Sequence, residues 1–319
     1  MLRYVLWRVF WMFFLLMLIL VVIYFSTTIV MLRHWGMPPY DLRAEFLFTF
    51  EGFRSYLHGI VTEWNWGVTG IYGENVWDYA AIRMWRSLWI NLLALAIYLP
   101  VGIGLGIASA FKKHSLFDKS VHLITMVLGS IPHFILGFLL IVFIGIRARW
   151  VPWRFPGFYT EDTQRFLLGL IIPLVALCLG PIFKFTRLVR AEFIEAEHEE
   201  YLLLCKTKGM KTNQALRRHG FRNCMVPVMP ELTPTFLYVL GGSFFIELIY
   251  GIDGVARLMM MSTIQPMMDF FVINIDIPLA VATTLFYATV GMTFALMVDI
   301  AYPLVDPRMR VGRKKTFFD

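Results

Sequence analysis

The chain contains 319 residues, of which 58% are hydrophobic and 16% are charged, and its mean hydropathy is +0.66. Soluble globular proteins have about 45–50% apolar and about 25% charged residues, and disordered chains combine low hydrophobicity with high net charge, so the composition excludes both classes. The net charge of +7 fits either a nucleic-acid-binding protein or the basic inner loops of a membrane protein.

Six apolar runs are long enough to cross a membrane, because a bilayer core of about 30 Å requires about 20 helical residues. The six runs are residues 9–32, 87–111, 120–146, 166–183, 224–246 and 277–305. The first run is long for a signal peptide, and no small-x-small cleavage site follows it, so we expect an uncleaved anchor. A further run, residues 258–268, is too short to cross and contains Pro266, which predicts a re-entrant or interfacial segment. The fold class predicted is therefore an all-α integral membrane protein with six transmembrane helices.

The positions of the basic residues predict that both termini face the cytoplasm. In that orientation, 19 of the 29 Lys and Arg residues lie in the inner segments and ten lie outside, as the positive-inside rule requires. This distribution accounts for the net charge. The inner loops also lack a basic patch with interleaved aromatic residues, so we expect no binding to nucleic acid. The prediction is a multi-pass protein of the cell membrane.

Residues 33–86 are predicted to form a large extracytoplasmic segment after the first helix. Pro38 and Pro39 would break the helix where it leaves the membrane. The segment is rich in aromatic residues, which belong either to the interfacial belt of a membrane protein or to a docking surface for an extracytoplasmic partner. These residues are Trp64, Trp66, Tyr72, Trp77, Tyr79 and Trp85.

The inner loop, residues 184–223, begins with acidic residues and turns basic, which suits the dipole of a helix. Gly209 is predicted to end this helix, and a second short helical piece is expected at residues 213–219, before Gly220. A short rigid helix that projects from two spanning helices is well suited to contact another protein. We therefore expect this loop to bind a cytoplasmic partner.

Residue patterns of catalytic and metal sites are absent from the sequence. It contains no GxxxxGK[ST] loop, no HExxH pair and no GxSxG elbow. The three cysteines are too few and too dispersed for a disulfide framework or a metal cluster. We predict no catalytic residue, no metal and no bound cofactor in this chain.

Ionisable residues within or at the ends of the spans are candidates for a role in the translocation path. They are Glu231, Glu247 and Asp299. For each of them, structural ion pairing competes with gating. Two interpretations also remain for the irregular helices in the spans: static close packing, or a path that opens and closes. The residues concerned are glycines at positions 102, 104 and 106 and prolines at positions 227, 230 and 234.

The inner-loop sequence EAEHEEYLLLCKTKGMKTNQALRRHGFRNCMVP resembles the cytoplasmic loop of the B-type permease subunits of oligopeptide and dipeptide ABC importers. The matching positions are Tyr201, Lys208, Gly209, His219, Arg222, Asn223 and Pro227. The runs SIPHF, GGSFFIE, GVARL and DPRMR, which begin at residues 130, 241, 254 and 306, resemble other parts of that family. The chain departs from the family pattern at Asp253, where a proline is usual, and at Glu231, which has no counterpart.

The resemblance implies the type I ABC importer permease fold, with the first helix in residues 1–32, a permease core in residues 87–310 and a cytoplasmic tail in residues 311–319. It implies a second homologous permease subunit, two cytoplasmic ATPase subunits that carry ATP and Mg, and an extracytoplasmic peptide-binding protein. This chain would form half of the path and would not itself be an enzyme. The residues implied in coupling to an ATPase are Glu195, Tyr201, Lys208, Gly209, His219 and Arg222.

Three alternatives remain open at this stage. The same machine could carry nickel or another small solute, because the sequence does not show the charge or shape of the path. The chain could also be a membrane enzyme, or a channel subunit that acts without ATP. Partner ATPases would distinguish the last two from an importer.

Overall fold

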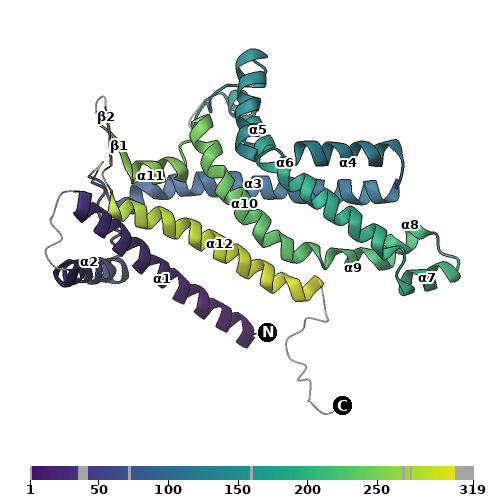
Figure 1. The fold of residues 1–319 in the computed structure, drawn as a ribbon, viewed down its shortest axis with the longest axis horizontal. Coiled ribbons are helices and arrows are strands. Elements are labelled where there is room, and N and C mark those ends of the chain that lie inside the picture. Colours follow the sequence, from purple (N-terminus) through teal and green to yellow (C-terminus); the bar gives the residue numbers. More distant parts are fainter. Residues whose placement is uncertain are drawn as a thin grey trace, which may run out of the picture. The chain divides into compact units, whose positions relative to one another are not determined.

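The computed structural model describes residues 2–34, 42–70, 73–158, 161–267, 270–273 and 275–305, and these are mostly helical (Figure 1). The helices are α1 Leu2–His34, α2 Leu42–Glu63, α3 Val76–Phe111, α4 Leu116–Leu128, α5 His133–Leu140, α6 Thr163–Ala196, α7 Glu200–Thr207, α8 Thr212–Ala215, α9 Phe221–Met225, α10 Val228–Tyr250, α11 Val255–Met261 and α12 Ile277–Val305. Pro38, Pro39, Tyr72, the DPRMR run and the predicted tail lie outside the described residues.

Two π-helical segments and one hairpin complete the described structure. Ile141–Arg147 continues α5, and Leu216–Gly220 continues α8. Strands β1 Ile264–Met267 and β2 Phe270–Ile273 pair antiparallel, with Ile264 opposite Ile273. The described part of the predicted re-entrant run, residues 258–267, therefore divides between the end of α11 and strand β1.

Among the described residues, five helices are long and apolar enough to cross a membrane: α1, α3, α6, α10 and α12. They confirm five of the six predicted spans, and α12 covers the same residues as the predicted sixth run, 277–305. In a bilayer the main-chain polar groups must be satisfied within each segment, so a helix is the form that such runs adopt.

The third predicted span, residues 120–146, is not one straight helix. Helix α4 ends at Leu128, and the helical segment that contains α5 begins at His133 and is bent by 96° from α4 (Figure 1). Pro132 lies at the start of α5, lacks an N–H, and also disfavours helical geometry at the residue before it. Apolar composition alone did not reveal this bend. Within the part of the chain that the structure describes, a sixth candidate span exists only if the bent pair is taken as one.

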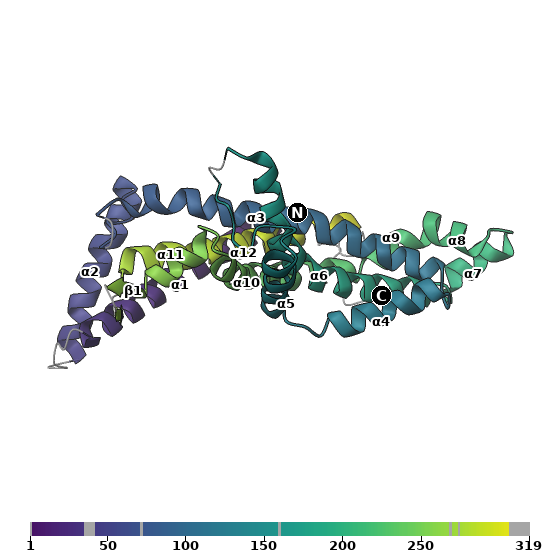
Figure 2. The same ribbon diagram turned by 90° about the horizontal axis from the view of Figure 1, so that it is seen from above.

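The described residues divide into two compact units. The first comprises α4 to α10 with the adjoining parts of α1, α3 and α12, and the second comprises α2 and α11 with the remaining parts of those three helices. In the first unit, α6 packs against α10, α5 and α4. Both views place α7 and α8 at the end of α6 that is distant from α5 (Figure 1, Figure 2).

Glycines allow α3 and α6 to approach closely in the first unit. A Cβ atom at Gly102 would lie 2.9 Å from the Cβ of Phe185, and one at Gly106 would lie 2.8 Å from the Cβ of Val189. Thr186 on α6 also donates a hydrogen bond of 3.3 Å from Oγ1 to the carbonyl oxygen of Gly102. Two glycines four positions apart therefore serve close helix packing. For Gly104, no atom lies within 4 Å of an added Cβ.

The second unit has its own apolar core. Side chains from the first turns of α3, such as Val76 and Ala80, pack with Leu258 on α11 and Leu279 on α12. A second cluster joins Leu20 of α1 and Phe53 of α2 to Val281 and Leu285 of α12. Three of the aromatic residues of the predicted outer segment, Trp64, Trp66 and Trp77, contact one another. Both roles considered for these aromatic residues stay predictions.

Candidate functional site

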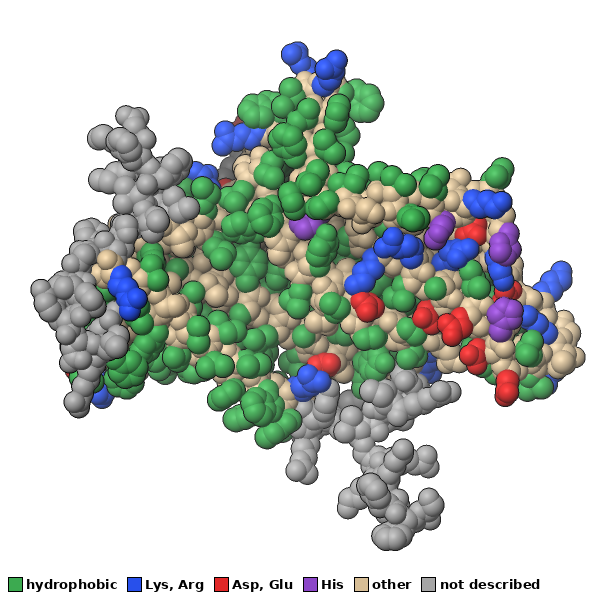
Figure 3. Space-filling model, in the orientation of Figure 1, with side chains coloured by type: hydrophobic (Ala, Val, Ile, Leu, Met, Phe, Trp, Pro, Cys, Tyr) green, Lys and Arg blue, Asp and Glu red, His purple; other side chains and the backbone are tan. Residues whose placement is uncertain are grey.

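An acidic cleft of about 330 Å³ lies in the first unit where α6 meets α7, and Figure 3 shows acidic side chains gathered there. Its carboxylates are those of Glu192 and Glu195 on α6 and of Glu199, which precedes α7. The cleft is also lined by Ala196, Tyr201, Asn223, Cys224, Val226 and Pro227. It therefore brings together two of the residues predicted to contact an ATPase, Glu195 and Tyr201. Concentrated carboxylates in a concave surface favour a basic group from a partner.

Gly209 ends α7 in a left-handed backbone conformation, with φ of +86°. Its N–H donates to the carbonyl of Lys206 at 2.9 Å, and the N–H of Met210 donates to the carbonyl of Cys205 at 3.2 Å. These two bonds are those of a Schellman motif, in which a glycine satisfies the last carbonyls of a helix. The predicted glycine break is therefore confirmed. The acidic residues are divided between the end of α6 and the start of α7, and the basic ones between the end of α7 and the start of α8.

Lys208 and His219 are exposed on the same loop. Lys208 caps the C-terminus of α7 and directly precedes Gly209, and His219 lies on the π-helical segment after α8. Neither they nor Gly209 line the acidic cleft. The six predicted coupling residues are thus distributed over the loop, and the described structure gathers only Glu195 and Tyr201 into one concavity.

Arg222 binds the end of α12. Its Nε donates to the carbonyl oxygen of Val305 at 2.8 Å, and its Nη2 donates to that of Leu304 at 2.7 Å. A guanidinium is favourable at the C-terminus of a helix, where carbonyls lack partners and the dipole is negative. Arg222 was predicted to contact an ATPase, whereas these bonds give it a role within the chain. They connect the exit of the inner loop to the last span.

The start of the inner loop is held by a buried carboxylate, Asp118, which sequence reasoning did not identify. Asp118 is 3% exposed and accepts hydrogen bonds from Arg190 Nε at 2.5 Å, Arg190 Nη2 at 2.8 Å and Ser109 Oγ at 2.5 Å. The backbone N–H of His114 donates to it at 3.0 Å. Its local signal is the Ser-x-x-Asp capping pattern that begins at Ser115, but the pairing with Arg190 joins residues 72 positions apart. This cluster ties the α3–α4 turn to α6.

Two of the three acidic residues proposed for the path form ion pairs. Glu231 Oε2 lies 2.6 Å from Lys184 Nζ, which also donates to Thr235 Oγ1 at 2.9 Å. Asp299 Oδ2 lies 3.0 Å from Nη1 of Arg8. Glu247 is 1% exposed on α10. Ion pairing is the structural alternative considered for these residues, and their role in gating stays a prediction.

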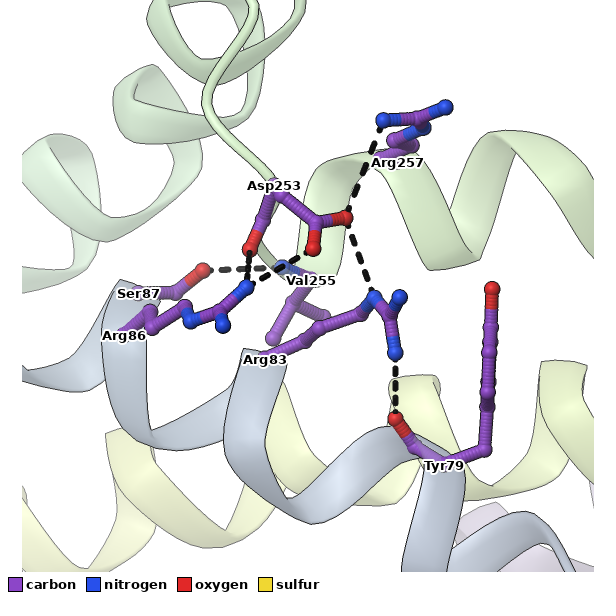
Figure 4. Close-up of polar contacts among 7 residues, drawn as sticks. All are labelled: Tyr79, Arg83, Arg86, Ser87, Asp253, Val255 and Arg257. Carbon is purple, nitrogen blue, oxygen red and sulfur yellow. Dashed lines mark hydrogen bonds and ion pairs between the residues drawn. The ribbon is translucent and has the colours of Figure 1, made fainter. Parts of the chain in front are cut away.

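Asp253 organises a cluster of arginines in the second unit (Figure 4). Its carboxylate accepts hydrogen bonds from Arg83 Nε at 3.0 Å and Arg86 Nη1 at 2.7 Å, and Arg257 lies 3.8 Å away. The guanidinium of Arg83 also lies over the ring of Tyr79. Sequence reasoning noted Asp253 only as a departure from a usual proline. The structure shows that it connects the start of α3 to the turn before α11.

Burial distinguishes the three cysteines. Cys178 and Cys224 are buried, and Cys205 on α7 is partly exposed. Burial and the nearby Glu192 carboxylate raise the pKa of the Cys224 thiol to about 11. A thiol reacts as its thiolate, so Cys224 is protected chemically as well as sterically at neutral pH. Cys205 is therefore the natural position for a chemical label.

Comparison with known proteins gives consistent results. Residues 102–311 match a family described as "Binding-protein-dependent transport system inner membrane component". A dipeptide transport system permease protein of Lactococcus lactis is 31% identical over 248 residues, covering 77% of this chain and 76% of that protein. A dipeptide transport system permease protein of Bacillus subtilis is 28% identical, covering 72% and 68%. An oligopeptide transport system permease protein of Salmonella typhimurium is 27% identical, covering 73% and 71%.

Proposed function

This chain belongs to the family of inner membrane components of binding-protein-dependent transport systems, and we propose that it is a permease subunit of an ATP-driven peptide importer. The observation that carries the proposal is the match to peptide permeases over about three quarters of the chain. The names of these relatives favour peptide over nickel as the cargo. The sequence contains no nucleotide-binding loop, which agrees with a subunit that is moved by separate ATPases.

The inner loop is proposed to receive force from an ATPase subunit. The acidic cleft offers a charged docking surface, and the Schellman motif at Gly209 fixes the direction of the chain beyond α7. Movement of the loop would reach α12 through Arg222 and would reach the α3–α4 turn through Arg190 and Asp118. A partner that binds one conformation of the loop more tightly shifts the permease toward that conformation. Alternating access then follows from rigid movement of the spans.

The importer proposal includes three kinds of partner. A second, homologous permease would complete the path, two cytoplasmic ATPases would hydrolyse ATP with Mg, and an extracytoplasmic binding protein would deliver peptide. The inner membrane implied by the family name agrees with the five apolar helices. Placement of both termini in the cytoplasm rests on the distribution of basic residues.

Labelled-peptide uptake by vesicles tests the proposed function. The chain is co-expressed with candidate permease, ATPase and binding-protein partners, and uptake is measured with and without ATP inside the vesicles. We expect uptake only when ATP and all partners are present. Equal uptake without ATP would indicate a channel, and chemical conversion of the peptide by this chain would indicate an enzyme; either result contradicts the proposal.

Cys205 allows a direct test of the orientation. We expect a membrane-impermeant maleimide to label Cys205 in inside-out vesicles and not in intact cells, because α7 is predicted to be cytoplasmic. The Cys205→Ser variant is the control and should show no labelling in either preparation, because Cys178 and Cys224 are buried. Labelling of Cys205 from the outside of intact cells would overturn the orientation and the coupling role of the loop.

A further inference from the structure

A second, larger pocket of about 720 Å³ lies in the first unit at the opposite end of α6. It is formed where the π-helical segment Ile141–Arg147 ends and α6 begins. Its apolar lining includes Ile146 and Leu168, and its polar lining includes Arg149 and Arg165. Two indoles, those of Trp150 and Trp153, also line it and are 75% and 60% exposed. The family features described above do not account for this pocket.

The wall of the pocket is fixed by contacts with α10. Tyr250 at the end of α10 donates a hydrogen bond of 2.7 Å from its hydroxyl to the carbonyl of Pro152, and its own carbonyl accepts one of 2.9 Å from the N–H of Phe155. Gly145 lets the chain return close to the helix, because a Cβ there would lie 2.9 Å from the Cα of Trp153. These contacts hold the wall of the pocket in place.

The charge of the pocket is positive. Residues 147–165 contain four arginines and two acidic residues. Neither Arg149 nor Arg165 forms a side-chain hydrogen bond or ion pair with another residue that the structure describes. Arg149 also has a left-handed backbone with φ of +56°, a conformation that is costly for a residue with a side chain and that is found at functional sites. Two exposed guanidiniums at one concavity favour an anion, and phosphate suits their geometry.

The pocket lies at the predicted boundary between lipid and water. Ile146 is the last residue of the apolar run 120–146, and Arg165 immediately precedes the run 166–183. Apolar side chains next to the pocket, Phe143 and Leu167, are each 59% exposed. Figure 3 shows hydrophobic side chains along the projecting segment that Figure 1 labels α5, with basic side chains at its tip. A ligand at this position meets apolar surface on one side and guanidiniums on the other.

We propose that this pocket binds the headgroup of an anionic phospholipid. The guanidiniums of Arg149 and Arg165 hold the phosphate, and the two indoles lie at the headgroup level, where tryptophan is favoured. An acyl chain extends along the exposed apolar side chains of Phe143 and Leu167. A soluble anion such as a peptide carboxylate would leave this apolar surface uncovered, whereas a phospholipid covers both parts.

Fluorescence quenching tests the proposal with the full-length chain in nanodiscs of phosphatidylcholine. A small fraction of brominated phosphatidylglycerol, or the same fraction of brominated phosphatidylcholine, is added as the probe. The contribution of the pocket is the difference between the wild type and the Trp150→Phe/Trp153→Phe variant. We expect this contribution to be quenched at least about twofold more strongly by the phosphatidylglycerol probe, because a binding site enriches its ligand locally.

A matched pair of double variants separates the pocket from general electrostatic attraction. Arg149→Gln/Arg165→Gln should abolish the preference, whereas Arg147→Gln/Arg154→Gln removes the same charge from residues that do not line the pocket and should retain it. Equal quenching by both probes would overturn the proposal, and so would an equal loss of the preference for phosphatidylglycerol in both double variants. So would a dipeptide that changes the same fluorescence in discs of phosphatidylcholine alone. The assay needs no ATPase and no transport, so its result is independent of the importer proposal.

Discussion

Replacing Gly209 with valine is expected to abolish ATP-driven uptake while the chain remains in the membrane. A left-handed conformation costs an L-residue about 1–2 kcal/mol, and more if the residue is β-branched. Valine would therefore break the two hydrogen bonds that end α7 and redirect the chain toward α8. Space is not the cause, because no atom lies within 4 Å of an added Cβ. Vesicle uptake and the amount of chain in the membrane are measured together.

Two controls distinguish loss of coupling from strain alone. Gly209→Asn should retain most uptake, because asparagine tolerates the left-handed region. Gly73→Val introduces the same kind of strain, at φ of +67° and with open space around it, in the predicted outer segment, and should retain uptake. Normal uptake by Gly209→Val would remove the coupling role of the loop. Normal amounts of membrane-inserted chain with no uptake would support it.

The second large effect is expected for Gly106→Val, which should destabilise the packing of α3 on α6. The new Cβ would lie 2.8 Å from the Cβ of Val189 and 2.9 Å from the carbonyl oxygen of Thr186, so the helices must separate. Overpacking of this kind costs about 1–3 kcal/mol, and a clash with backbone is relieved less easily than one with a flexible side chain. A lower unfolding temperature of the purified chain in detergent is the expected result.

Gly104→Val is the matched control, because it adds the same side chain two residues away on the same helix, where no atom lies within 4 Å of a Cβ. It should not lower the unfolding temperature. If both variants unfold at the same temperature, close approach of α3 and α6 at Gly106 does not stabilise the chain. The comparison also separates packing from the small change in helix propensity, which both variants share.

The spans and the glycine break were predictable because each depends on residues adjacent in sequence. An apolar run must form a helix in lipid, and a glycine such as Gly209 commonly ends a helix because it adopts the left-handed conformation that the helix end requires. The bend between α4 and α5 had a local signal in Pro132 that run length alone did not use. No local signal predicted the pairing of Asp118 with Arg190 or the binding of α12 by Arg222, because these contacts join residues 72 to 83 positions apart. Such contacts follow from how helices pack, which apolar patterns leave open.

The attachment of Arg222 to Leu304 and Val305 has a consequence for biosynthesis. Those carbonyls emerge from the ribosome 82 and 83 residues after the arginine that binds them. During translation, these two hydrogen bonds at the end of the inner loop can therefore form only after the final helix has been synthesised. A polypeptide that ends before Leu304 would lack both carbonyl acceptors, and the Arg222 guanidinium would then have neither of these two bonds.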